Sequence, residues 1–380
     1  MKNDFAYEES EMKKTIRRFA RNELLPLHRK IDEEGDLSGR IKEKFLSLGI
    51  LKSAFPEEYG GGGGLLTNMM TALKELAYAS TVPSLMLLEN FLLAFPILHY
   101  GSGYLKKTCL PDLVSLKSIG ALAFTETDTG SDPKQLKTAA EKVGGGWIIN
   151  GAKRFITYSG TCDAMILFAK TGESVTAFLV EPKNKGYRVG RREKFIHTSS
   201  IDNGDIYLED YFASDDSVIG NIGQGFEILL RTEAVGKIGF SAIYIGVAER
   251  AVDLSIQYAN TKTHRGKPIG RKFQMIQVKL AEMATMLAAV NSYLYQTCTT
   301  MDRGEDIFAG SAVLKLMVGE NIKKIASDAM EIHGAYGLTE DFDISDLFRT
   351  AISAQTVMGS LDVQRVIIAR AVLERGVSEI

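Results

Sequence analysis

Apolar residues recur at helical spacing through the first third of the chain. Met12, Ile16, Phe19 and Leu24 follow one another at intervals of three to five residues. This spacing places apolar side chains along one face of a helix. The pattern therefore predicts a helical N-terminal domain, which we expect over residues 1–117.

The apolar pattern becomes shorter in the middle third of the chain. Residues 146–150 and 164–169 are short runs rich in β-branched and aromatic residues, and Gly, Asn and Asp separate such runs. Short runs bounded by turn residues are typical of β-strands. We expect antiparallel β structure here, in a central domain over residues 118–222.

Long helical periodicities return from Gly225 onward. They extend over residues 243–258, 277–301 and 307–333, and Gly and Pro are largely confined to the joints between them. The pattern predicts a helical C-terminal domain over residues 223–380. The chain as a whole is expected to be an α+β multidomain protein with the order α, β, α.

Composition narrows the class of protein. The 380 residues are enough for two or three domains, and a net charge of −2 gives no reason to expect nucleic acid or an anionic membrane as partner. The three cysteines are far apart, so a reduced cytoplasm is expected rather than a disulfide framework. No run approaches 18 apolar residues, so no membrane span is expected, and the five histidines have no ligand-like spacing that predicts a metal site.

Four local motifs follow one another along the chain. The first is a strand-like run that ends in a loop rich in hydroxyl groups and glycine, which can supply backbone N–H and hydroxyl donors to a ring system and phosphates. The others combine glycine with aromatic, amide or hydroxyl side chains. In order, the motifs are residues 121–132, residues 151–160, residues 266–274, and the pair 333–337 with 351–365.

Together with residues 56–61, these motifs resemble those of the flavin-dependent acyl-CoA dehydrogenase superfamily, in the same order and at nearly the same spacing. The resemblance extends over almost the whole chain. It implies a helical N-terminal domain, a central β-barrel domain and a C-terminal four-helix bundle, with FAD held between barrel and bundle. It also implies a homodimer or homotetramer in which the adenine end of FAD reaches a neighbouring subunit.

The resemblance assigns FAD contacts residue by residue. Phe124, Thr125 and Ser131 are expected to contact the isoalloxazine and pyrophosphate, while Phe155 and Thr157 flank the flavin near N5. An aromatic side chain taken alone more often packs in a core than against a cofactor, but the collinear motifs favour cofactor contact. The rest of the FAD is expected to meet Gln274, Ser360 and Asp362.

Met358 stands where most members of the superfamily carry the glutamate that removes the α-proton of an acyl thioester. A thioether has no proton affinity near neutral pH. The superfamily's second base position falls on Gly236, next to Lys237 at the usual arginine. Two candidate bases remain: Glu233, on the same helix face as Gly236, and Glu89, on an N-terminal helix that borders the acyl pocket in this superfamily. For each, a structural or exposed glutamate is the default interpretation.

A flavin oxidation of an alcohol or hydrated aldehyde needs no α-proton base, because a hydride leaves carbon and only a hydroxyl proton must be removed. The chain is similar to a branch that oxidises three-carbon units on acyl carrier proteins to hydroxymalonyl or aminomalonyl extender units for polyketide assembly, and most of all to the aminomalonyl-forming enzymes of colibactin-like pathways. Within this hypothesis Lys237 holds the thioester carbonyl or the developing carboxylate by its charge.

Three alternative functions remain open at this point. The first is a CoA-ester desaturase with a relocated base, and the second is a flavin monooxygenase of the same fold. The third is a catalytically silent homologue that binds a carrier protein. The departures from the superfamily's pattern at Met358, Gly236, Lys262 and Glu331 keep this last alternative open.

Overall fold

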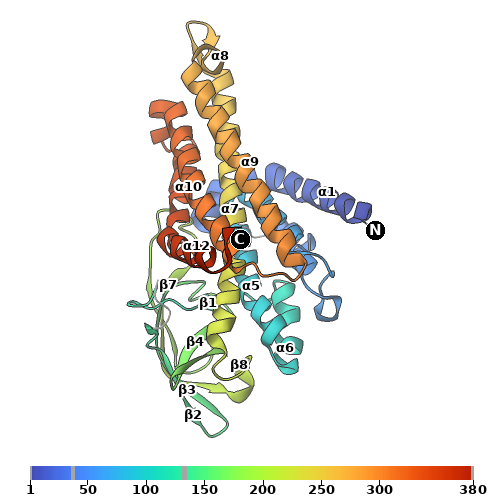
Figure 1. Cartoon of the computed structure of the whole chain (residues 1–380), viewed down its shortest axis with the longest axis vertical. Helices are drawn as coiled ribbons and strands as arrows, with labels where there is room; N and C mark the ends of the chain where they lie inside the picture. Colours follow the sequence, from blue (N-terminus) through green and yellow to red (C-terminus); the bar gives the residue numbers. More distant parts are fainter. Residues whose placement is uncertain (1, 36–38, 131–134, 378–380) are drawn as a thin grey trace.

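The computed structural model describes residues 2–35, 39–130 and 135–377, and it places the sheet at one end of a long helical body (Figure 1). The candidate Ser131 lies outside these residues. The N-terminal part is helical, as the periodicity predicted. Its helices are α1 (Lys2–Phe19), α2 (His28–Glu34), α3 (Gly39–Ser47), α4 (Leu66–Ala77), α5 (Thr81–Tyr100) and α6 (Gly103–Val114).

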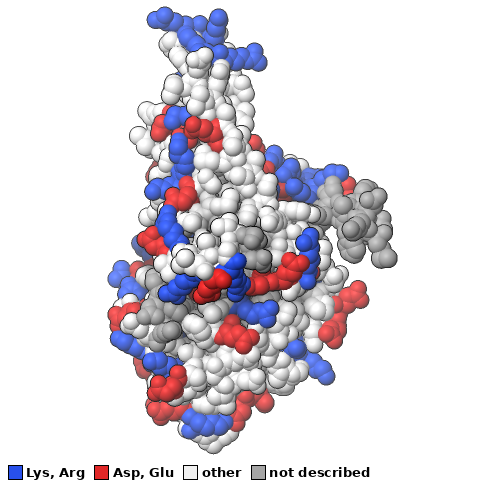
Figure 2. Space-filling model, in the orientation of Figure 1, with Lys and Arg blue, Asp and Glu red and all other residues white. Residues whose placement is uncertain are grey.

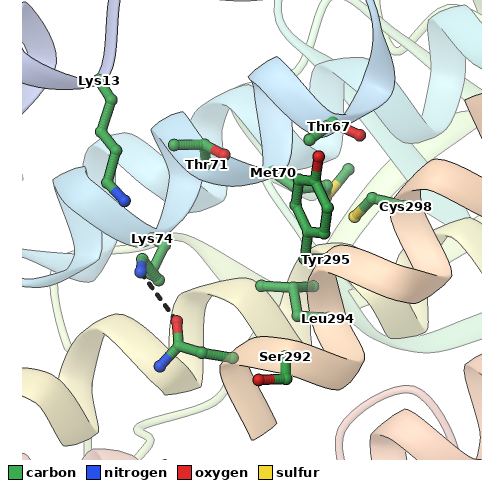
Figure 3. Close-up of a pocket in the computed structure, with 10 residues that line it drawn as sticks. Lys13, Thr67, Met70, Thr71, Lys74, Ser292, Leu294, Tyr295 and Cys298 are labelled. Carbon is green, nitrogen blue, oxygen red and sulfur yellow. Dashed lines mark hydrogen bonds between the residues drawn. The ribbon is translucent and has the colours of Figure 1, made fainter. Parts of the chain in front are cut away.

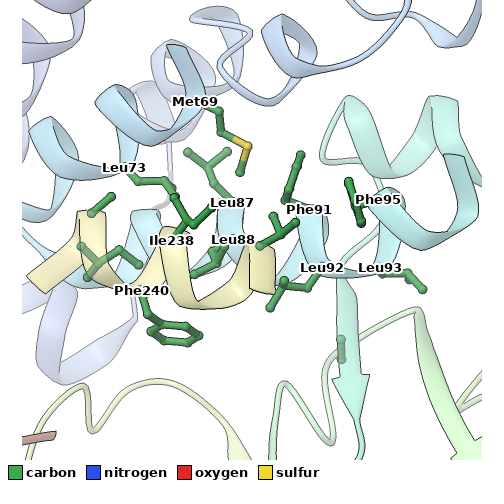
Figure 4. Packing of buried hydrophobic residues seen from close by; sticks show 14 of the residues in the cluster. Met69, Leu73, Leu87, Leu88, Phe91, Leu92, Leu93, Phe95, Ile238 and Phe240 are labelled. Carbon is green, nitrogen blue, oxygen red and sulfur yellow. The ribbon is translucent and has the colours of Figure 1, made fainter. Parts of the chain in front are cut away.

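The helix α5 is the core helix of this part. Ser80 caps its start, accepting a hydrogen bond from the N–H of Val82 at 3.3 Å. By length and apolar composition α5 is able to cross a membrane, but 83% of its most apolar window is buried inside the protein. Figure 4 shows why: Leu87, Leu88 and Leu92 of α5 pack among apolar side chains of α4 and α7. The burial identifies α5 as an internal packing helix.

The middle part is one mixed β-sheet. The path of paired strands is β6-β7-β3-β2-β4-β5-β8, and β1 pairs with β4 beside it. Strands β1 and β4 run parallel, with Gly120 opposite Ala164, and β2 meets β4 in parallel at Ala139 and Lys170. The expectation of purely antiparallel structure is wrong for these two pairs, because the apolar pattern predicts strands but not their direction. The strands are β1 (Gly120–Ala123), β2 (Ala139–Val143), β3 (Gly146–Thr157), β4 (Ala164–Thr171), β5 (Ser174–Val180), β6 (Tyr187–Arg192), β7 (Asn203–Ser214) and β8 (Val218–Ile219).

The C-terminal part is again helical, with a short hairpin at its tip. Figure 2 shows both signs of charge spread over the visible face, with basic side chains gathered around α8 at this tip. The three long helices agree with the predicted ones, although α7 starts earlier than the periodicity indicated. The elements are α7 (Gly225–Thr261), β9 (Thr263–His264), β10 (Lys267–Pro268), α8 (Ile269–Lys272), α9 (Gln274–Asp302), α10 (Phe308–His333), α11 (Ile344–Ile352) and α12 (Leu361–Arg375).

Glycines on α7 let the two helical parts approach closely. A Cβ atom added at Gly239 would lie 2.3 Å from Cδ1 of Leu88 on α5. A Cβ atom added at Gly246 would lie 2.2 Å from the carbonyl oxygen of Lys74 on α4. Because no side chain fits at these crossings, α7 sits directly against α4 and α5.

Candidate functional site

The aromatic side chain of Phe155 is turned outward by an irregularity in β3. The register between β3 and β7 shifts between Lys153 and Ile156, and Phe155 has φ +59°. A bulge of this kind redirects a side chain that strand alternation would place elsewhere. Phe155 is 48% exposed, and its ring centre lies 6.3 Å from that of Phe195. The bulge therefore presents a flat apolar surface at the edge of the sheet.

Thr157 links the end of β3 to Glu89 on α5. Its Oγ1 accepts a hydrogen bond from Nδ2 of Asn203 at 3.3 Å, and Thr157 also hydrogen-bonds Glu89. Burial raises the pKa of Glu89 to about 8, against the opposing effects of Thr157 and the backbone N–H of Leu122. The structure thus brings Glu89 against Thr157, two residues after Phe155 on β3, and burial favours the protonated form of Glu89.

The loop after β1 is anchored beneath this surface. Phe124 is buried and meets Phe168 edge-on at 6.1 Å, so its side chain packs in the core. The carbonyl of half-buried Thr125 accepts a hydrogen bond from the N–H of Arg154 at 2.8 Å, which ties the loop to the bulge. A bound cofactor would therefore contact Phe124 through its backbone atoms rather than through its ring.

A buried ion pair fixes the same loop from inside. Lys153 Nζ lies 2.9 Å from Oε1 of Glu126, and it also donates to the carbonyl of Phe168 at 2.7 Å. Burial on its own would raise the pKa of Glu126, but the charge of Lys153 and the hydrogen bonds it receives outweigh burial and lower the pKa. Glu126 is consequently a charged structural group rather than a proton acceptor for substrate.

The two positions that the sequence singled out for a missing base lie against each other. A Cβ atom added at Gly236 would lie 2.0 Å from Cε of Met358 and 3.4 Å from Cδ2 of Leu92. Met358 itself has φ +56°, a left-handed backbone conformation that few residues other than glycine adopt. The thioether side chain occupies the space that a side chain at position 236 would need.

Lys237 is almost completely enclosed, at 1% exposure. Burial lowers its pKa, and the charge of Glu233, one helical turn earlier, opposes that change. Burial likewise raises the pKa of mostly buried Glu233, with the charge of Lys237 opposing it. Across the described ranges no hydrogen bond or ion pair joins the two side chains, and Nζ of Lys237 lies 5.4 Å from the ring centre of Phe308.

A second buried lysine was not singled out from the sequence. Lys315 on α10 is fully buried and donates a hydrogen bond to the carbonyl of Ala354, in the turn that leads to Met358. Burial and then the charge of Lys237 lower the pKa of Lys315 to about 8. The only sequence signal is its place in the apolar run 312–318, where a lysine is normally expected to face solvent.

The remaining predicted cofactor residues do not join this group within one chain. Gln274 is exposed at the start of α9, at the helical tip far from the sheet (Figure 1), where it lines a shallow pocket of about 580 Å³ with Phe273 and Met275. Ser360 caps α12 by accepting from the N–H of Val363. Asp362 is exposed and pairs with Arg365 at 2.8 Å.

Another pocket, of about 400 Å³, opens between α1, α4 and α9 (Figure 3). Its wall includes Lys74, which donates a hydrogen bond to Oδ1 of Asn291 at 2.9 Å. Tyr295 and Cys298 lie on its α9 side. None of the candidate site residues lines this pocket, so it is separate from the group around Phe155.

Several buried polar atoms lack a hydrogen-bond partner in the part of the chain that the structure describes. Near the bulge these are Oδ1 of Asn203, Oγ1 of Thr129 and the hydroxyl of Tyr158. On α7 the hydroxyl of Ser241 is also buried without a hydrogen-bond partner among these residues. Buried polar groups are normally satisfied, so these atoms are the ones that a bound molecule or water would complete. No group of histidine, cysteine and carboxylate side chains suited to a metal occurs among the described residues.

Comparisons with known proteins place this geometry in a family. The N-terminal, middle and C-terminal domains of acyl-CoA dehydrogenases match residues 6–117, 121–211 and 223–373. The chain is 32% identical over 369 residues to the 3-(aryl)acrylate reductase of Clostridium sporogenes, covering 96% of this chain and 98% of that protein.

Solved structures agree with the sequence comparison. The FAD complex of PigA superimposes with a TM-score of 0.90 at 27% identity and covers 97% of this chain and 98% of PigA. The prolyl acyl carrier protein oxidase AnaB superimposes with a TM-score of 0.87 at 25% identity and covers 96% of this chain and 98% of AnaB. The expected arrangement of helices, sheet and helices is confirmed at this level.

Proposed function

The chain belongs to the acyl-CoA dehydrogenase superfamily, and from this premise we propose that it oxidises a small acyl unit held as a thioester on an acyl carrier protein. It is a flavin-dependent oxidoreductase, and its cofactor is FAD. The proposed product is a malonyl-type unit, aminomalonyl or hydroxymalonyl, made by oxidation of a hydrated aldehyde to a carboxylate.

The residues at the bulge suit FAD. The half-exposed ring of Phe155 offers a flat apolar face, and Asn203 Oδ1 and Thr129 Oγ1 are buried polar atoms without partners in the described residues. A heteroaromatic ring with N–H and carbonyl groups along its edge matches that set. When bound, FAD supplies an acceptor for the hydride that leaves the substrate carbon.

The observation that carries the proposal is the contact between Gly236 and Met358. Neither residue is able to take up a proton, and their packing fills the space where a carboxylate at either position would be. Neither position 236 nor position 358 therefore supplies a base that could remove an α-proton. Oxidation of a hydrate avoids that step, since the only proton to be removed is on oxygen, which ionises far more readily than carbon.

A small acyl unit fits the packing between α5 and α7. Leu88 lies against Gly239, and Leu92 and Met358 lie against Gly236. These side chains occupy the volume that a long acyl chain along the crossing of the two helices would need. The similarity to AnaB, a prolyl acyl carrier protein oxidase, supports a carrier protein rather than CoA as the handle.

Two side chains have proposed roles in the reaction. Lys237 holds the thioester carbonyl or the developing carboxylate through its charge. Glu89, beside Thr157, is the first candidate to accept the hydroxyl proton, in its ionised form, while Glu233 is the second candidate because it lies one helical turn from Lys237.

The test is anaerobic mixing of the FAD-loaded protein with four thioesters, followed by the flavin absorbance. Two are the oxidised seryl and glyceryl aldehydes on carrier protein, and two are butyryl-CoA and octanoyl-CoA. We expect bleaching only with the carrier-bound aldehydes. Bleaching by the simple acyl-CoAs alone would overturn the proposal and favour desaturation with Glu89 as a relocated base, since Glu89 is a buried carboxyl beside Thr157 that no lysine or arginine pairs with among the described residues.

A further inference from the structure

Two lysines are buried together between α7, α10 and the turn formed by residues 353–355. Lys237 is 1% exposed and Lys315 fully buried, and the charge of one acts on the other. Lys315 is held in place by its hydrogen bond to the carbonyl of Ala354. The turn is held to α7 from the other side, because the hydroxyls of Tyr244 and Ser353 hydrogen-bond at 2.8 Å.

A polar side chain beside the two lysines lacks a hydrogen-bond partner among the described residues. Ser241 lies one helical turn after Lys237 on the same face of α7. Its hydroxyl is buried without a partner in the described residues, and Nζ of Lys237 lies against the ring of Phe308, at 5.4 Å from the ring centre. A polar atom without a partner is therefore present one helical turn from Lys237.

The charges of the cluster are unbalanced as well. The carboxyl closest in sequence is that of Glu233, which is mostly buried and forms no ion pair with Lys237. Buried ammonium groups are strongly destabilised unless an anion or several hydrogen bonds compensate for lost hydration. A ligand that brings a negative charge and two or more acceptor oxygens would supply what the cluster lacks.

We propose that Lys237, Ser241 and Lys315 form a subsite that holds the carboxylate formed at the end of the acyl unit, so that the protein binds the acid-terminated product more tightly than a neutral analogue. This inference rests on the proposed function in one respect, the acyl thioester ligand. The subsite is next to Met358 along the chain, since Ala354 and Met358 are in one turn segment. The carboxylate that the subsite holds is that of the malonyl-type product.

The experiment measures binding and needs no turnover. The FAD-loaded protein is titrated calorimetrically with malonyl-N-acetylcysteamine and with its methyl ester, which differ by one negative charge. We expect the acid to bind at least about tenfold more tightly than the ester, which corresponds to roughly 1.4 kcal/mol. Equal affinity of the two ligands for the unmodified protein would overturn the proposal without any variant.

Substitutions of Lys237 and Lys315 test whether these lysines cause the preference for the acid over the ester. Lys237→Met and Lys315→Met keep the length and apolar stem of the side chain, and each should abolish the preference for the acid. Lys237→Arg, which keeps the charge, should retain it, as should Lys323→Met on the exposed side of α10. A preference that survives in both methionine variants would place the carboxylate elsewhere and overturn the proposal.

The two proposals fail separately. A protein that prefers the acid but is not bleached by carrier-bound aldehydes has the carboxylate subsite without the proposed oxidation. A protein that is bleached by them and binds acid and ester equally performs the oxidation without the subsite.

Discussion

In the proposed reaction, the pairing of Gly236 with Met358 decides which proton the site is able to remove. Glycine has no side chain, and the thioether of Met358 has no titratable group. The end of the Met358 side chain lies where a side chain at position 236 would be. The nearby carboxyls differ in environment: Glu89 is buried beside Thr157, and Glu233 is mostly buried beside Lys237. In the proposed function, the choice of substrate therefore depends on a pair of residues 122 positions apart in the chain.

Replacing Met358 by glutamate restores a base. Met358→Glu should make butyryl-CoA bleach the flavin, because an unbranched carboxylate side chain of similar length then occupies the place of the thioether. Stopped-flow absorbance under anaerobic conditions measures the rate. The matched control is Met358→Gln, which has the same shape and no base, and bleaching by this control would refute the explanation.

Removing the charge of Lys237 should separate chemistry from cofactor binding. Lys237→Ala is expected to lower turnover of the carrier-bound aldehyde by at least about tenfold, since a preorganised cation near developing negative charge is lost. The FAD content of the purified protein should stay close to that of the unmodified protein. Full activity in Lys237→Ala would eliminate its proposed role, and Lys323→Ala serves as the surface control.

For single residues, the sequence identified site residues that lie in a motif. It did not identify residues whose role depends on their burial. A motif led to Phe155 and Thr157, and the resemblance led to Glu89, which hydrogen-bonds Thr157 in the fold. Lys315 has no motif, because a lysine in a helix is normally solvated and its burial depends on how α10 packs. The orphaned hydroxyl of Ser241 is likewise a property of packing.

Among the elements, α7 combines packing and chemistry on one helix. Gly239 and Gly246 face α5 and α4, while Lys237 faces Phe308 of α10. The position of Lys237 therefore depends on the close packing of α7 against α4 and α5 at these glycines.

Substitution at two of these glycines should have unequal effects. Gly246→Ala places a Cβ atom 2.2 Å from the backbone oxygen of Lys74, which is unable to yield, so we expect a loss of about 1–3 kcal/mol of unfolding free energy. Gly236→Ala meets only the flexible end of Met358 and should cost less than about 1 kcal/mol. Urea denaturation of the FAD-loaded variants compares them, and an equal loss would contradict the packing argument.

Helices were predictable from sequence and strand direction was not. The 3.6-residue period of 307–333 matches α10 closely, because an amphipathic helix encodes its own buried face. The parallel pairing of β1 with β4 depends on a crossover between distant strands, and a period of two residues carries no information about it.

For the whole molecule, pH should alter stability through Glu89. Its folded pKa of about 8 lies above the ordinary value of 4.5, so the folded state holds a proton that the unfolded state releases. The resulting stabilisation is complete below about pH 4.5 and is lost as pH rises through 8. Glu89→Gln lacks this dependence.

Unfolding free energies of the two proteins at pH 5 and pH 8 measure the effect. The unmodified protein should lose on the order of a few kcal/mol relative to Glu89→Gln over this interval. Parallel pH profiles would show that Glu89 is ionised or solvated in the folded protein.

The order of helices, sheet and helices could be predicted for the whole chain, but the contacts that define the site could not. Residues of α5, β3, α7, α10 and the turn before α12 meet there, and each contact joins segments far apart in sequence. Such contacts follow from packing of complete elements rather than from local pattern.

The most direct measurement is exchange of the α-protons of butyryl-CoA in D₂O with the FAD-loaded protein under anaerobic conditions, followed by mass spectrometry of the thioester. With Gly236 and Met358 at the two base positions, the unmodified protein should add no deuterium beyond the rate without protein, whereas Met358→Glu should add it. Rapid incorporation by the unmodified protein would contradict the account. Loss of that incorporation in Glu89→Gln would then identify Glu89 as the base.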